Sequence, residues 1–181
     1  MSWRPRARYV LGVSVELLIR PGREADVPGV LELWDIAIAW MVERGQPEQW
    51  GTEPASANER ARRAVREWQH DGGLRIAELD GVAVGASAIS AAPPPHVAPL
   101  TRPETYLQFL ISDRRHAGRG IGAALVHHAL AEARAARSQL LRVDCWAGAP
   151  RLVSWYEQQG FIRSGTFTVG QWHGQVFELE L

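Results

Sequence analysis

Apolar and polar residues along the chain follow two different periods, which predicts a protein that mixes strands with helices. Strands are predicted where β-branched and aromatic residues run together or alternate with polar ones. These stretches are 15–20, 74–79, 82–90, 105–112, 140–146, 161–169 and 175–181. Helices are predicted where apolar residues recur every three or four positions, over 27–43, 59–71, 121–137 and 150–159.

The first helix has the clearest apolar face. Its apolar residues follow one another in steps of four, three, four and three: Val27, Leu31, Trp34, Ile38 and Met41. This spacing places all of them on one side of a helix. We therefore expect that side to pack on the core.

Polar residues and glycines indicate where the elements begin and turn. Asp26 precedes the first helix, and its carboxylate is predicted to cap the free N–H groups of the first turn. Ser56 and Glu59 have the spacing of a capping box before the second helix. Asp80-Gly81 predicts a tight hairpin turn, and His173-Gly174 is predicted to be the turn of a final hairpin.

The order of these elements predicts an α/β (α+β) fold. Hairpins give antiparallel strand pairs, whereas the crossover from 105–112 through a helix to 140–146 gives a parallel pair. We expect a mixed, mostly antiparallel sheet of six or seven strands with about four flanking helices. A length of 181 residues fits one domain, placed at 15–181 after a flexible extension over 1–14. Arginines before a short apolar patch only faintly resemble a secretion signal, because Glu16 interrupts the patch.

Composition and charge narrow the class of protein. A hydrophobic share of 46% excludes a disordered chain. The 20 basic residues, all arginine, balance 20 acidic ones, which argues against a general nucleic-acid binder. The sequence has no run of 18 apolar residues, so it predicts no membrane-spanning helix. The lone Cys145 cannot form an internal disulfide, so we expect a reducing, cytoplasmic location.

A glycine-rich turn lies between the predicted strand 105–112 and the helix after it. Its residues are Ala117, Gly118, Arg119, Gly120, Ile121, Gly122 and Ala123. The first N–H groups of a helix lack partners within it and attract anions, and glycines let an anion approach the backbone. Arg114, Arg115 and Arg119 face only Asp113 in this stretch, a surplus of two positive charges. We therefore predict a phosphate or pyrophosphate site.

Two other interpretations of this turn stay open. It can be a tight turn without a ligand. Gly118-x-Gly120-x-x-Ala123 also fits a dinucleotide-binding fingerprint, with Asp144 about twenty residues later. A Rossmann domain needs further βα units after that acid, whereas only a short helix and a hairpin are predicted there.

The chain resembles the GNAT superfamily of acyl-CoA-dependent N-acyltransferases from about Val15 to Leu181. The matching segments are Leu18-Ile19-Arg20-Pro21 followed by Asp26, Tyr106-Leu107-Gln108-Phe109-Leu110-Ile111-Ser112, Arg119-Gly120-Ile121-Gly122, and Trp155-Tyr156-Glu157-Gln158-Gln159-Gly160-Phe161. Trp40-Met41-x-x-Arg44-Gly45 and Asp144-Cys145-Trp146-Ala147-Gly148 are similar to a bacterial subgroup whose acceptors are mostly unassigned.

The resemblance implies transfer of an acetyl group from acetyl-CoA to a primary amine, by direct attack on the thioester. The strand ending at Leu110, Ile111 and Ser112 would splay from its parallel neighbour and pair with the pantetheine arm. The N–H of Leu110 or Ile111 would stabilise the oxyanion. The turn from Ala117 to Ala123 would hold the pyrophosphate, and Tyr156 would protonate the leaving thiolate.

Three residues depart from the family pattern. Many members have Gln or Arg where Ala117 stands and Asn where Ala149 stands, and Ser112 replaces a more usual valine. In family members that asparagine orients the CoA arm, so alanine at position 149 implies weaker CoA binding or a bridging water.

The remaining candidates are weaker. Glu104, at the entry to the strand beside the thioester, is the first candidate for the general base, with a water relay as the alternative. Trp50 follows the first helix, in a loop that covers the acceptor cleft in this family, and is predicted either to line the acceptor site or to pack on the fold. Cys145 is expected to be a buried strand residue, and no spacing of His, Cys, Asp or Glu predicts a metal site.

The sequence thus predicts an N-acetyltransferase acting on a small-molecule or peptide amine, without nucleic-acid or membrane partners and with a homodimer as one possible state. The alternative is a CoA-binding or small-molecule-binding module without turnover.

Overall fold

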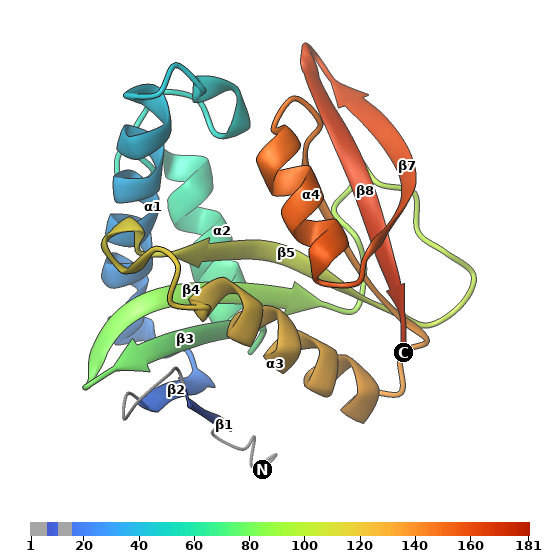
Figure 1. Cartoon of the computed structure of the whole chain (residues 1–181), viewed down its shortest axis with the longest axis horizontal. Helices are drawn as coiled ribbons and strands as arrows, with labels where there is room; N and C mark the ends of the chain where they lie inside the picture. Colours follow the sequence, from blue (N-terminus) through green and yellow to red (C-terminus); the bar gives the residue numbers. More distant parts are fainter. Residues whose placement is uncertain (1–6, 11–15) are drawn as a thin grey trace. The chain divides into compact units, whose positions relative to one another are not determined.

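The computed structural model describes residues 7–10 and 16–181, and within them it contains eight strands and four α-helices (Figure 1). The strands are β1 (Ala7–Val10), β2 (Glu16–Pro21), β3 (Leu74–Leu79), β4 (Val82–Ser90), β5 (Glu104–Ser112), β6 (Leu140–Trp146), β7 (Ile162–Val169) and β8 (Trp172–Glu180). The α-helices are α1 (Val27–Val42), α2 (Glu59–His70), α3 (Ile121–Ala135) and α4 (Pro150–Gln158). Short 3-10 turns are η1 (Glu24–Asp26), η2 (Pro47–Gln49) and η3 (Arg114–His116).

The strands form the predicted mixed, mostly antiparallel sheet. Hydrogen-bonded neighbours follow the order β1-β2-β3-β4-β5-β6-β8-β7. β5 pairs in parallel with β6, with Glu104 opposite Leu140 and Leu107 opposite Val143, whereas the hairpin strands pair antiparallel. The predicted parallel pair and the four helices are confirmed, while the splaying of β5 from β6 stays a prediction.

One strand was not predicted. β1 pairs antiparallel with β2, from Ala7 opposite Ile19 to Val10 opposite Glu16, and raises the strand count to eight. It lies inside the range predicted as a flexible extension, so for residues 7–10 that prediction is wrong. The sequence alone hides β1 because its strand character comes from the edge of β2 that it joins. Residues 1–6 and 11–15 lie outside the described residues.

The chain divides into two compact units. The first comprises the described residues up to 88 together with 109–128, and the second comprises 89–108 and 129–181. Both β5 and α3 have residues in each unit. The assignment of 15–181 to one domain stays a prediction.

The first unit buries apolar side chains on both faces of its strands. On one face, α1 and α2 pack on β3, β4 and the end of β5 around Val30, Val65, Ile76 and Phe109. On the other face, the start of α3 packs on β2, β3 and β4 around Leu17, Leu79, Val84 and Leu125. Strand residues alternate between the two cores, as the pleat requires. The predicted core face of α1 is confirmed, with Trp34 partly buried and the other four residues buried.

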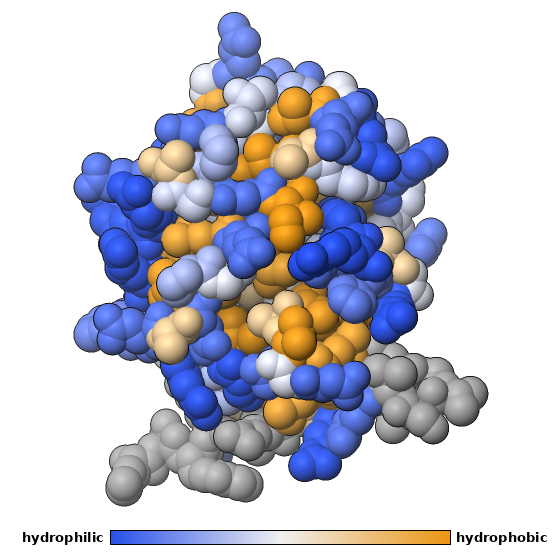
Figure 2. Space-filling model, turned by 90° about the vertical axis from the view of Figure 1, so that its left-hand side faces the viewer, coloured by the Kyte–Doolittle hydropathy of each residue, from blue (hydrophilic) through white to orange (hydrophobic). Residues whose placement is uncertain are grey.

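Seen from the side on which α1 lies in Figure 1, the surface is mostly hydrophilic with scattered apolar patches (Figure 2). Val42, at the end of α1, is one of the exposed apolar residues, at 40%. Such scattered exposure is ordinary for a folded protein. Charge and chemistry, rather than apolar exposure, therefore have to locate a site on this unit.

Two predicted caps and one turn are wrong. Asp26 is the N-cap of α1, but its side chain makes no capping bond, because it accepts from the Arg20 guanidinium instead. Asn58, not Ser56, caps α2 by accepting from the Ala61 N–H. The last hairpin turns at Gly170-Gln171 rather than His173-Gly174. Gly170 has a φ of +60°, the left-handed conformation that a tight turn needs.

Arg20 joins β2, β3 and the start of α1 through two carboxylates. Its Nη1 and Nη2 donate to Asp26 at 2.7 and 2.8 Å, and its Nε donates to Glu78 at 2.9 Å. Arg20 is 9% exposed, so these charge-assisted bonds are shielded from water. The hydrogen bonds from Arg20 lower the pKa of Asp26 below its usual value.

We expect Asp26→Asn to remove part of the acid sensitivity of folding. A carboxyl with a lowered pKa in the folded state stabilises the protein above its unfolded pKa, and this contribution is lost as pH falls through the folded value. Urea unfolding at pH 7 and pH 3 should show a smaller loss of stability at low pH in Asp26→Asn than in the wild type. Glu24→Gln, which changes an exposed acid in the same turn, is the control. Equal losses in Asp26→Asn and the wild type would contradict the role of the pair.

Candidate functional site

The end of β5 leads directly into the glycine turn of the first unit. Asp113, 1% exposed, follows β5, and its N–H donates to the Val84 carbonyl of β4 at 2.8 Å. Its carboxylate accepts from the Arg115 N–H at 2.9 Å and pairs with the Arg115 guanidinium at 2.8 Å. Burial by itself would raise the pKa of Asp113, but the hydrogen bonds from Arg115 outweigh it and lower the pKa. Asp113 thus fixes the chain where β5 ends.

Two glycines of the turn require a conformation that other residues rarely adopt. Gly118 has a φ of +79° and Gly120 a φ of +75°, in the left-handed region that favours glycine. A Cβ on Gly118 would have no atom within 4 Å, so the space beside its backbone is open. The glycine turn predicted from the sequence is therefore a turn that bares its backbone.

The start of α3 presents unbonded N–H groups next to this turn. The first bond of the helical pattern runs from the Ala124 N–H to the Gly120 carbonyl at 2.9 Å. The N–H groups just before Ala124 therefore have no partner within the helix. Together with the positive end of the helix dipole, they favour an anion.

At Gly85, β4 lies unusually close to the end of β5 and the start of α3. A Cβ at Gly85 would lie 2.9 Å from the Ile111 carbonyl oxygen and 2.9 Å from Ile121 Cγ2. Only glycine allows β4 to approach both the end of β5 and the first turn of α3. The sequence analysis did not single out Gly85, because the neighbours that need it are distant in the sequence.

The arginines near the turn do not act as one group. Arg115 is held by Asp113, whereas the Arg114 guanidinium lies over the ring of Trp40, 4.5 Å from its centre. Arg119 is exposed within the turn. His116 adds a buried Nδ1 atom that has no hydrogen-bond partner among the described residues. Arg114 and Arg115 thus have partners outside the glycine turn, and the prediction that the three arginines serve a phosphate there stays a prediction.

Leu110, Ile111 and Ser112 are the last three residues of β5. Ile111 is buried against the core under α1 and α2, and Leu110 is partly buried and packs on the opposite core. Ser112 is the last residue of β5 and is partly buried. Their pairing with a pantetheine arm stays a prediction.

Tyr156 belongs to the second unit and is buried at 4% exposure. Its ring lies 5.8 Å from that of Phe161 and 5.4 Å from that of Phe177, between ring centres. Burial, with smaller contributions from Cys145 and Asp144, raises the pKa of Tyr156 above its usual value. The Tyr156 hydroxyl therefore keeps its proton at neutral pH.

Helix α4, which carries Tyr156, begins without a side-chain cap. Its N-cap is Ala149, whose methyl group cannot accept a hydrogen bond, and Pro150 occupies the first helical position. The asparagine that the resemblance implies at this position would have supplied a polar side chain here. Cys145 on β6 is buried, and burial raises the pKa of its thiol to about 12, which confirms a buried strand cysteine.

Two acids of the second unit, Asp144 and Glu104, are engaged within the fold. Asp144 accepts from the Tyr106 hydroxyl at 2.5 Å. Glu104 accepts from Arg142 Nη1 at 2.9 Å and from the Leu100 N–H at 3.1 Å. Both oxygens of Glu104 are thus occupied by fixed donors, an arrangement that favours a structural role over that of a base.

Trp50 lies in an aromatic group of the first unit. Its ring centre is 5.6 Å from that of Trp34 and 6.1 Å from that of Phe109. It packs on the core under α1 and α2 while staying partly exposed. Of its two predicted roles, packing on the fold has direct support, and contact with an acceptor stays a prediction.

Two kinds of feature are absent from the described residues. No group of three or more His, Cys, Asp or Glu in residues 7–10 and 16–181 is arranged to hold a metal ion. None of the helices in this part of the chain has both the length and the apolar character needed to cross a bilayer.

Comparison with known proteins places the chain in a family. Residues 39–161 match the acetyltransferase (GNAT) family, and no curated protein matches the chain. An acetyltransferase of the GNAT family from Listeria monocytogenes has a TM-score of 0.76 at 20% identity, over 97% of this chain and 100% of the other. The GNAT domain of S. lividans PAT has a TM-score of 0.73 at 17% identity, over 97% of both chains. A ribosomal-protein-alanine N-acetyltransferase from Brucella melitensis has a TM-score of 0.67 at 21% identity, over 90% and 99%.

These structural likenesses show the fold, and the family match covers more than half of the sequence, including the glycine turn and Tyr156. The chain therefore belongs to the GNAT acetyltransferase family.

Proposed function

We propose that this protein transfers the acetyl group of acetyl-CoA to a primary amine of a small-molecule or peptide acceptor. The observation that carries the proposal is the glycine turn, where left-handed Gly118 and Gly120 open the backbone just before α3. The bared N–H groups suit the pyrophosphate of CoA in geometry and in charge. The exposed Arg119 and the His116 Nδ1, which has no hydrogen-bond partner in the described part of the chain, add polar groups next to the same turn.

The acceptor amine attacks the thioester carbonyl directly and must arrive without its extra proton. The backbone N–H of Leu110 or Ile111 donates to the oxyanion that forms. Residues Leu110, Ile111 and Ser112 pair with the amide-like pantetheine arm in the manner of an added strand. Tyr156 then donates its proton to the departing thiolate. Without an asparagine at Ala149, the CoA arm loses one polar contact that the family provides.

The turn is tested by giving it a negative charge. Gly118→Asp should weaken CoA binding by about 100-fold or more, because the carboxylate points into the open space where a pyrophosphate would lie. Asp and Asn tolerate a positive φ better than most residues, so the fold should survive. Isothermal titration with CoA measures the effect.

Two controls separate charge from backbone strain. Gly118→Asn carries the same shape without the charge and should bind CoA better than Gly118→Asp. Gly72→Asp places the same residue at a φ of +72° in another open turn of the first unit, and should leave CoA affinity within about twofold of the wild type. A wild type that does not bind millimolar CoA, or a Gly118→Asp variant that binds like wild type, would overturn the assignment of the turn.

A CoA-binding module without turnover is the second candidate. Ala149 and the engaged carboxylate of Glu104 favour it, because each removes a polar group that a catalytic site could use. Thiol release from acetyl-CoA on incubation with a panel of amines would decide for the transferase. CoA binding with no thiol release above the buffer rate would decide for the module.

A further inference from the structure

Trp40 and two arginines form a cationic group on the first unit that the proposed reaction does not use. The Arg44 and Arg114 guanidinium carbons lie 4.2 and 4.5 Å from the centre of the Trp40 ring. Arg44 comes from the chain just after α1, one helical turn beyond Trp40, and Arg114 comes from η3, immediately after β5. Two segments far apart in the sequence thus direct positive charge to the same indole ring.

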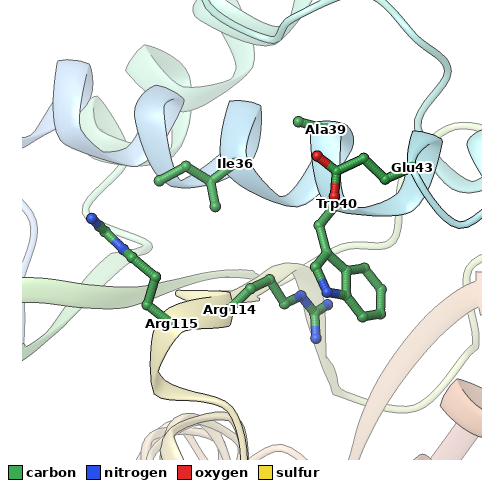
Figure 3. Close-up of a pocket in the computed structure, with 6 residues that line it drawn as sticks. All are labelled: Ile36, Ala39, Trp40, Glu43, Arg114 and Arg115. Atoms are coloured by element: carbon green, nitrogen blue, oxygen red, sulfur yellow. The ribbon is translucent and has the colours of Figure 1, made fainter.

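Trp40 and Arg114, but not Arg44, line an open pocket of about 400 Å³. It is lined by Ile36, Ala39, Trp40, Glu43, Arg114 and Arg115. Figure 3 shows the Arg114 guanidinium beside the Trp40 ring, with Ile36 and Ala39 on the α1 side of the pocket. The pocket therefore offers one aromatic wall, a short aliphatic stretch and two arginines, together with the Glu43 carboxyl group.

The charges around the pocket leave Arg114 without compensation. Arg115 is matched by Asp113 at 2.8 Å. Arg44 meets Glu43 only at 3.8 Å, with both side chains at least half exposed, a contact of little strength. No carboxylate forms an ion pair with Arg114 in the part of the chain that the structure describes. Desolvation of the Arg114 guanidinium and, second, repulsion by Arg44 lower the pKa of Arg114.

The Trp40 ring holds the Arg44 and Arg114 guanidinium groups close together, so their positive charges repel each other. An anion placed between their N–H groups would relieve that repulsion. A guanidinium stacked on an aromatic face has its fork of N–H donors held in one plane, which suits the two oxygens of a carboxylate or phosphate. The stacking also limits the rotamers of both arginines, so less entropy is lost on binding.

We propose that Arg44, Trp40 and Arg114 form an anion-binding subsite that holds the carboxylate or phosphate group of the acceptor. This inference rests on the proposed acetyl transfer, and it predicts that the amine belongs to an acidic or zwitterionic molecule rather than to a polyamine. The position of Arg114, two residues after the end of β5, ties the subsite to the strand that is proposed to hold the thioester.

The subsite can be tested without turnover. Inorganic phosphate is titrated into CoA-saturated protein while the arginine Nε–Hε signals are followed by NMR, so that the glycine turn is already occupied. We expect saturable shifts in the wild type and at least a tenfold weaker affinity in both Arg114→Gln and Arg44→Gln, since one charge-assisted anion contact is worth about that much. Arg63→Gln, which removes an exposed arginine of α2, is the matched control and should bind as wild type.

Three results would overturn the subsite. The first is that the wild type does not bind phosphate saturably. The second is that Arg114→Gln and Arg44→Gln both bind phosphate as tightly as the wild type. The third is that the control Arg63→Gln loses as much phosphate affinity as they do. If CoA itself does not bind, the proposed function fails, and the titration is then run on Gly118→Asp without CoA, which still judges the subsite.

A second comparison identifies the source of the anion. Amino acids and their amides are offered as matched acceptors, and Arg114→Gln should lower kcat/KM for the acids at least tenfold while leaving the amides within about twofold. The affinities of CoA and 3′-dephospho-CoA are measured for the same variant. If Arg114→Gln weakens CoA tenfold but not dephospho-CoA, the anion is the 3′-phosphate of CoA and the acceptor assignment is wrong. Equal effects on acids and amides would overturn it as well.

Discussion

Replacing Tyr156 by phenylalanine should lower kcat by about 100-fold or more while leaving the fold intact, because a general acid typically contributes that much. The ring of Tyr156 packs between Phe161 and Phe177, and phenylalanine preserves this packing. Only the proton donor is lost. Steady-state kinetics with acetyl-CoA and any accepted amine measure kcat, and thermal unfolding checks the fold.

The pH dependence adds a second readout. Burial raises the pKa of Tyr156, so its hydroxyl stays protonated through neutral and mildly alkaline pH. The wild-type rate should therefore show no fall between pH 7 and 9 from loss of this proton. KM for acetyl-CoA should change little in Tyr156→Phe, because the hydroxyl acts on the leaving group.

Tyr106→Phe is the matched control for the loss of a buried hydroxyl. Tyr106 is fully buried in the same unit, and its hydroxyl donates to Asp144. Removing that hydroxyl leaves a buried carboxylate with one donor fewer, at a cost of about 1–3 kcal/mol in stability. We expect Tyr106→Phe to lose stability but to keep kcat within about fivefold. A Tyr156→Phe enzyme with wild-type kcat would remove Tyr156 from the acid role.

The fold was largely predictable because local pattern and tertiary structure agree here. The apolar stripe of α1, from Val27 to Met41, predicts its buried face without reference to any partner. The glycine turn was also found, since left-handed positions such as Gly118 and Gly120 favour one residue type. In both cases a constraint within one segment decides the outcome.

Predictions failed where the deciding partner lies far away in the sequence. Asp26 has the residue type and the position of a helix cap, but its carboxylate accepts two charge-assisted hydrogen bonds from the Arg20 guanidinium instead of capping the helix. β1 forms because the edge of β2 accepts it. Gly85 is required by Ile111 and Ile121, which follow it by more than twenty residues.

The candidate site shows the same difference between features set by local sequence and features set by distant partners. The glycine turn and Tyr156 lie in sequence motifs, so they could be proposed as site residues from the sequence. The stacking of Arg114 on Trp40 could not, because it joins η3 to α1. The spacing of Trp40 and Arg44, one helical turn apart, could have indicated half of that group. The sequence indicated Glu104 as a candidate base from its place beside a strand but gave no sign of its partner Arg142, and the role of a base stays a prediction.

Arg142→Met should destabilise the protein by about 3–5 kcal/mol, because it leaves the Glu104 carboxylate buried without its cation. The two side chains are 8% and 4% exposed, and the Nη1 to Oε2 distance is 2.9 Å. Arg142 also donates to the Ala98 carbonyl at 3.1 Å, and Glu104 accepts from the Leu100 N–H at 3.1 Å. The pair therefore fastens the loop before β5 to the parallel strands β5 and β6. Urea unfolding at pH 7 measures the loss.

The double variant Glu104→Gln/Arg142→Met is the control for a paired charge. It removes both charges, so it should be less destabilised than the sum of the single variants by about 1–3 kcal/mol. A structural Glu104 also makes a kinetic prediction, since Glu104→Gln enzyme that is still folded at the assay temperature should keep kcat within about fivefold. Additive stabilities would show that the ion pair contributes nothing, and a 100-fold fall in kcat with an altered pH profile would restore Glu104 as the general base. Stability and rate thus separate the two roles of one carboxylate, because a buried pair acts on the folding equilibrium, whereas a base acts on the amine.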